Sequence, residues 1–245
     1  MIVNQKNEAW EIFSHSSHGL LAGKIAHEIA DSYKCENWVA TLAAIIEHDD
    51  RQLNFDEKNY LTEMGTPKDF LLENRNVHEI VKRSKRLLRQ AEEKSIWISM
   101  LIAHHLQFIH KEMAGKKKTL SKFIKELEET EASYIKDLNL TTKKVDAIYQ
   151  IMVFADRCSL ILCQDEIPMK NRKLEINTSI AGKTFWLKGK ESGDIQIEPW
   201  IFDKKNFTVE AQYKLIAQSS FNSKNEFESL LNKSPVQIKS WNLCE

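Results

Sequence analysis

The chain has 245 residues, of which 35 are basic and 35 are acidic, so its formal net charge is zero. Its 42% hydrophobic and 29% charged residues are typical of a globular protein with a sizeable buried core. Zero net charge excludes a protein that coats nucleic acid or anionic membranes by bulk electrostatics, and 7 glycines leave little material for glycine-rich phosphate loops.

The amino-terminal segment and the cysteines indicate in which cellular compartment the protein is found. Residues 1–10 are polar and lack the basic and apolar regions of a signal peptide, and the longest apolar run, residues 38–46, is too short to span a bilayer. The 4 cysteines are scattered and form no CxxC pair, which is typical of reduced thiols. We therefore expect a cytoplasmic protein that does not enter membranes.

Helical periodicity runs from the start of the chain to about residue 165. Polar caps and apolar stripes predict where the helices begin. The expected helices are, in chain order, one capped by Ser16 or Ser17, one capped by Asn37, one begun by Thr66-Pro67, those at residues 77–88, 95–113 and 120–138, and a last one capped by Thr141 or Thr142.

The pattern changes after Pro168, where short alternating runs are separated by turn-forming residues. The expected strands lie at residues 174–176, 184–187, 195–197, 207–209, 213–216 and 236–238, with a short helix at residues 222–232. The sequence thus predicts a mainly α protein. Its all-α body would span residues 1–167, and a small antiparallel β appendage, residues 168–245, would pack on it.

The sharpest chemical signal is Glu47-His48-Asp49-Asp50 at the end of a predicted apolar helix. A histidine beside carboxylates combines nitrogen and oxygen ligands that suit a divalent metal ion. The alternative interpretation is a polar helix end, where a histidine interacts favourably with the helix dipole and the acids are solvated. On this segment alone, the alternative is the commoner case.

Further polar residues on apolar helices favour a metal site. His18 lies one predicted helix earlier, His104 and His105 lie within the most apolar helix, and Asp156 shares a face with Met152 and Leu160. An unpaired buried carboxylate carries a heavy desolvation cost, and one metal ion would supply a partner for several such groups at once.

This order of histidines and aspartates on successive helices resembles the HD superfamily of metal-dependent phosphohydrolases. The resemblance implies an HD-domain-like helical bundle in which His18, His48, Asp49 and Asp156 bind the metal ion. It also implies catalytic roles for Asp49 and for His104 and His105, which would bind phosphoryl oxygens or a second ion. The ion would be Mn²⁺, Fe²⁺, Co²⁺, Ni²⁺ or Zn²⁺.

Parts of the chain are also similar to an uncharacterised bacterial family with an HD-like pattern and a β-rich tail. The similarity rests on residues 15–23, 44–50 and 154–160. One departure concerns the residues after the His-Asp pair: many HD enzymes have glycine and lysine there, whereas this chain has Asp50, Arg51 and Gln52. Arg51 is a candidate substrate-binding residue in place of that lysine.

Three functions remain open at this point. The first is hydrolysis of a phosphorylated small molecule or nucleotide, whose phosphate could also contact the basic run at residues 82–89, although such runs are more often solvated. The second is a non-catalytic protein that binds a ligand or partner, and the third is a di-iron oxygenase. We expect no duplex nucleic acid and no membrane as partners, and a homodimer is possible.

Overall fold

The computed structural model describes residues 1–49, 53–56, 58–73, 76–170 and 172–245. Its elements are, in chain order, β1 (Ile2–Lys6), β2 (Ala9–Phe13), α1 (His15–His27), the 3-10 helix η1 (Asp31–Tyr33), α2 (Trp38–Glu47), the 3-10 helix η2 (Phe70–Leu72), α3 (Val77–Glu92), α4 (Ile96–Ala114), α5 (Lys118–Asp137), α6 (Thr142–Cys163), β3 (Leu174–Ile180), β4 (Lys183–Gly189), β5 (Ile195–Glu198), β6 (Asn206–Ile216), α7 (Lys224–Lys233) and β7 (Val236–Cys244).

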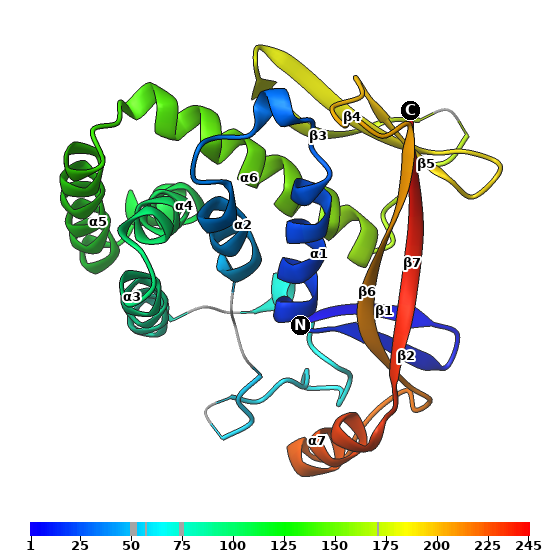
Figure 1. Cartoon of the computed structure of the whole chain (residues 1–245). Coiled ribbons are helices and arrows are strands. Elements are labelled where there is room, and N and C mark those ends of the chain that lie inside the picture. Colours follow the sequence, from blue (N-terminus) through cyan, green and yellow to red (C-terminus); the bar gives the residue numbers. More distant parts are fainter. Residues whose placement is uncertain (50–52, 57, 74–75, 171) are drawn as a thin grey trace.

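The strands form one seven-stranded sheet in the order β1-β2-β6-β7-β5-β4-β3. Neighbouring strands are antiparallel except β5 and β7, which are parallel. Figure 1 shows a curled sheet with α1 to α6 on one side of it, α1 and α6 nearest to the strands, and α7 at one end of the sheet. The fold is therefore α/β, with 49% helix and 21% strand, and our prediction of a mainly α protein with an all-α body is wrong.

The error arises first at the amino-terminal end of the chain, which we expected to belong to the helical body. Residues 2–13 instead form the β1–β2 hairpin, and β2 pairs with β6 through Trp10–Ile216 and Ile12–Lys214. Strand formation here depends on a partner far along the chain, so local pattern alone does not reveal it. The sheet is therefore not a small carboxyl-terminal appendage, and it is not wholly antiparallel.

A second error concerns individual elements. The segments at residues 207–209 and 213–216 belong to the single strand β6. Thr66-Pro67 begins no helix, because Pro67 forms an isolated bridge with Leu61 and the next helical turn is the short η2. The cap of α1 is Ser14, whose hydroxyl accepts a hydrogen bond from the amide of Ser17.

Other local signals correspond closely to the observed helices. The Thr141 hydroxyl accepts a hydrogen bond from the Lys144 amide and caps α6, and Ser95 caps α4 through the Trp97 amide. None of the helices in the described ranges is both long and apolar enough to cross a membrane.

The edge of β6 that extends beyond its pairing with β2 contacts α1. Beyond the last residue that pairs with β2, two carbonyl groups of β6 accept hydrogen bonds from side chains of α1: Ser17 Oγ donates to Gln212 O at 2.6 Å, and Lys24 Nζ donates to Glu210 O at 3.1 Å. These contacts satisfy backbone acceptors that would otherwise lack a strand partner. They hold α1 beside the sheet, with its other face toward α2 and α6.

The contact between α1 and α2 is unusually close. A Cβ atom on Gly19 would collide with the carbonyl oxygen of Ile46, and one on Gly23 would collide with the Ile46 side chain. Only glycine permits this approach of the two backbones. The close approach brings the neighbours of Gly19 and Ile46 together, among them His18 and His48.

Candidate metal centre

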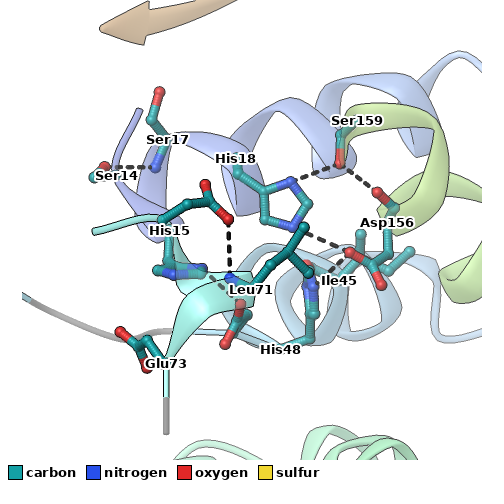
Figure 2. Close-up of polar contacts among 12 residues, drawn as sticks. Ser14, His15, Ser17, His18, Ile45, His48, Leu71, Glu73, Asp156 and Ser159 are labelled. Atoms are coloured by element: carbon teal, nitrogen blue, oxygen red, sulfur yellow. Dashed lines mark hydrogen bonds and ion pairs between the residues drawn. The ribbon is translucent and has the colours of Figure 1, made fainter. Parts of the chain in front are cut away.

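Three helices bring His18, His48 and Asp156 to one point, as Figure 2 shows. His18 lies in the first turns of α1, His48 directly follows α2, and Asp156 lies in the middle of α6. Nε2 of His18 and Nε2 of His48 are each 3.0 Å from Oδ1 of Asp156. One ligand atom from each residue lies within 4.8 Å of the other two.

The hydrogen bonds on the far sides of both imidazoles determine their tautomers. Nδ1 of His48 lies 2.6 Å from the carbonyl oxygen of Ile45, which can only accept, so Nδ1 carries a proton. Nδ1 of His18 lies 2.9 Å from Oγ of Ser159, whose own proton is donated to the Asp156 carbonyl oxygen at 2.8 Å. Nδ1 of His18 is therefore also the donor.

When both imidazoles are neutral, these tautomers leave both Nε2 atoms as electron-pair donors directed toward the Asp156 carboxylate. Nε2 of His18 is buried and, despite its distance of 3.0 Å from Asp156, has no hydrogen-bond geometry. Separations near 3 Å are those expected between two ligand atoms that each lie about 2.1 Å from a shared metal ion. Outer hydrogen bonds from Nδ1 to oxygen are the usual support of metal-binding histidines. The residues present therefore fit a divalent ion.

Burial and charge distinguish this group from a surface cluster. His18 is 1% exposed and His48 is 3% exposed, while the Asp156 side chain is 19% exposed and gives access from solvent. Burial disfavours the imidazolium form of His48, but the charge of Asp156 and its hydrogen bond outweigh this effect and raise the pKa of His48 to about 9. Burial also disfavours the Asp156 carboxylate, but the charge of His48 together with the hydrogen bonds and charge of both histidines outweighs it, and the pKa of Asp156 lies below its ordinary value.

Asp49 follows His48 directly but has a different partner. Its Oδ2 lies 2.7 Å from Nδ1 of His15, a buried residue one turn before His18 on α1. Asp49 is outside the group of three ligands found among the described residues. Its charge nevertheless acts on His48, because it contributes to the raised pKa of that imidazole. The structure thus places Asp49 beside the centre, with its carboxylate next to the buried ring of His15.

The adjacent histidines of α4 point to different places. The ring of His105 lies 5.0 Å from the ring of His48, measured between centroids, so His105 borders the centre. His104 instead contacts α5, where its Nδ1 lies 2.7 Å from Oε1 of Glu131. Arg51, the remaining predicted site residue, lies outside the described residues.

Sequence reasoning did not identify Ser159 as a residue that supports a candidate ligand. Ser159 lies three positions after Asp156, on the same face of α6, and this spacing is a signal that could have identified it. The partnership of His15 with Asp49 carries no such signal, because it joins two helices. Glu131 was read as part of an amphipathic helix, although it is buried.

A family model described as a protein of unknown function, DUF3891, matches residues 1–218. The matched range includes all three ligands of the candidate centre, and it ends before α7 and β7. No curated protein and no solved structure matches the chain.

Proposed function

The chain belongs to the DUF3891 family, whose function is unknown, and from the arrangement of its own residues we propose that it is a metal-dependent phosphohydrolase. Its substrate would be a phosphorylated small molecule or a nucleotide. The observation that carries the proposal is the convergence of Nε2 of His18, Nε2 of His48 and the Asp156 carboxylate, with both Nδ1 atoms already engaged as donors. The resemblance of the ligand order to the HD superfamily supports a hydrolytic role.

Each residue has a part that follows from its contacts. His18, His48 and Asp156 would hold the ion, and Ser159 and the Ile45 carbonyl would keep the two imidazoles in the ligand tautomer. A divalent ion bound here would lower the pKa of a water molecule and polarise a phosphoryl oxygen. Asp49, held by His15, would orient the attacking water and accept its proton.

The first experiment measures metal content by elemental mass spectrometry in protein purified without chelator. Wild type is compared with His48→Ala and Asp156→Asn, and the control is His27→Ala, which changes an exposed histidine of the same helix α1 as His18. We expect near-stoichiometric metal in wild type and control and its loss in both ligand variants, with folding checked by circular dichroism. A folded wild type that stays empty after incubation with Mn²⁺, Fe²⁺ and Zn²⁺ would refute the metal centre.

The second experiment tests catalysis with the ion that the first one identifies. We expect turnover of phosphomonoesters or nucleotides, and a decrease of about 10²- to 10⁴-fold in Asp49→Asn, because this variant loses the general base. Metal content should remain unchanged in Asp49→Asn. Bound metal without turnover across phosphomonoesters, phosphodiesters and nucleotides would contradict hydrolysis and favour the non-catalytic binding alternative.

A further inference from the structure

A cleft of about 670 Å³ is lined by residues of α1, the loop at residues 53–56, β6, α7 and β7. Among the described residues, neither the two candidate histidine ligands nor Asp156 lines it. α1 contributes to both places, because Ser17, Leu20 and Lys24 line the cleft whereas His18 belongs to the candidate centre. The cleft is therefore a second candidate site, separate from the metal centre.

Part of the cleft wall is apolar and open to solvent. Leu20 of α1 is 47% exposed, and Val236 and Ile238 of β7 are 56% and 59% exposed. Val236 and Ile238 are two positions apart in the strand, so their side chains project from the same face of the sheet. Covering these side chains with an apolar ligand is favourable, because it removes hydrocarbon from water. A cleft of this volume suits a small molecule, whereas a protein partner needs a much larger surface.

The two lysines that line the described part of the cleft are already engaged by the protein. Nζ of Lys24 donates to the carbonyl oxygen of Glu210 at 3.1 Å and lies 3.3 Å from Oε1 of the same residue. Nζ of Lys214 donates to the carbonyl oxygen of Leu231 at 2.6 Å, near the carboxyl-terminal end of α7. An anionic ligand would therefore have to compete with these contacts for an ammonium group.

The remaining two charged residues along the described part of the cleft are acidic. Neither the Asp56 nor the Glu228 side chain has a hydrogen bond or an ion pair with the described residues. Glu228 lies on α7 one turn after Lys224, whose Nζ donates to the carbonyl oxygen of Phe55 in the loop that carries Asp56. α7 and this loop therefore form one wall, and its two carboxylates favour a positively charged ligand.

We propose that the cleft binds a small organic cation with an apolar body, such as a long-chain primary amine. The apolar body would cover Leu20, Val236 and Ile238, and the ammonium group would pair with the carboxylates of Asp56 and Glu228. The family model matches residues 1–218, so α7 and β7 supply this site from outside the matched range. The inference does not depend on the proposed hydrolysis.

The direct test uses n-decylamine, a cation at neutral pH, and compares it with decanoate, which has a chain of the same length and the opposite charge. Calorimetric titrations are carried out with EDTA present, so that the amine cannot bind a metal ion. We expect saturable binding of decylamine, roughly tenfold tighter than that of decanoate. Asp156→Asn should bind decylamine like wild type, because Asp156 does not line the cleft.

Two variants locate the binding site. Ile238→Thr keeps a β-branched side chain but removes apolar surface, and should weaken decylamine binding about 3- to 10-fold. Its control is Val39→Thr, which changes an exposed aliphatic residue of α2 outside the cleft.

The double variant Asp56→Asn and Glu228→Gln should weaken decylamine binding by a similar factor of about 3 to 10 while leaving decanoate binding no weaker. Its control neutralises two exposed acids of α5 in the double variant Glu128→Gln and Glu129→Gln. Circular dichroism checks that every variant is folded. Absence of saturable decylamine binding, equal affinity for decanoate, or an affinity that either cleft variant leaves unchanged would each overturn the inference.

Discussion

Between His48 and Asp156 lies a position that either a proton or a metal ion can occupy. A proton and a metal ion therefore compete for it, which makes the affinity for metal depend on pH. The pKa of His48 is about 9 in the metal-free protein, so below that pH the imidazole is protonated and must lose its proton when a cation binds. The pKa of Asp156 lies below its ordinary value, so this carboxylate stays ionised over the same range. The affinity for metal should therefore follow the ionisation of His48.

We expect the apparent affinity for Zn²⁺ to rise roughly tenfold per pH unit up to about pH 9 and to level off above it. Calorimetric titrations in buffers of different ionisation enthalpy would measure both the affinity and the proton released. Each ion bound at neutral pH should release about one proton from His48. An affinity that does not change between about pH 7 and about pH 8 would show that His48 is not a ligand.

Ser159 supports His18 in a way that one substitution can test. In Ser159→Ala, Nδ1–H of His18 loses its acceptor, and the ligand tautomer is no longer enforced. Loss of such an outer hydrogen bond typically weakens metal binding by about 10- to 100-fold. The matched control is Ser99→Ala, a buried serine on α4, which should bind metal like wild type. Equal metal affinity in both variants would contradict the role given to Ser159.

At the scale of elements, the contact between α1 and α2 brings His18 and His48, the two candidate histidine ligands, close together. Gly19→Ala would place a methyl group against the Ile46 carbonyl and force the helices apart. We expect a loss of about 1–3 kcal/mol in the free energy of unfolding, as for other overpacked contacts, together with weaker metal binding. Thermal denaturation and metal titration would measure the two effects.

The control for this helix contact is Gly115→Ala at the end of α4. An added Cβ there would lie 3.6 Å from the Glu112 carbonyl oxygen, an ordinary contact distance. This variant should keep both its stability and its metal content. Full metal affinity in Gly19→Ala would mean that the spacing of α1 and α2 is not what brings His18 and His48 together.

The sequence predicts some helices and strands much better than others. The difference depends on whether the residues that stabilise an element are close to it or far from it in the sequence. α4 and α6 were predicted closely because a cap and an apolar stripe lie within the helix itself. The β1–β2 hairpin was missed because its place in the sheet depends on the pairing of β2 with β6, which joins residues about 200 positions apart. In the centre, His18, His48 and Asp156 were predicted as ligands from the HD resemblance, and the structure brings them together. The partner of Asp49 depends on side-chain geometry that no sequence pattern carries.

At the scale of the whole molecule, one hydrophobic core joins helices and sheet. It includes Ile25 of α1, Phe154 of α6, Phe185 of β4 and Trp241 of β7. The rings of Phe154 and Phe185 lie 5.4 Å apart between centroids. Residues before and after position 168 therefore contribute to the same buried cluster. The division into a helical domain and an appendage at this position remains a prediction, and the shared core argues for cooperative unfolding.

We expect a single unfolding transition in denaturant, in which the helices and the sheet unfold at the same denaturant concentration. The reason is that unfolding either layer would expose the hydrophobic core that both layers share. Far-ultraviolet circular dichroism would follow the helices. Tryptophan fluorescence would follow the sheet in the double variant Trp38→Phe and Trp97→Phe, which removes these two tryptophans from the helical layer. This variant keeps Trp186 and Trp241 in the sheet. Two separated midpoints would instead support independent units at residues 1–167 and 168–245.

The pairing of β2 with β6 also has a consequence for biosynthesis. The ribosome releases the β1–β2 hairpin and the histidines of α1 long before it makes β6, whose carbonyls hold α1 in place. The nascent chain therefore carries His15 and His18 on a helix that has no sheet to rest on. We therefore expect the candidate ligands to take up their final geometry only after translation has passed residue 216. Metal acquisition would thus be a late, largely post-translational event in the life of this protein.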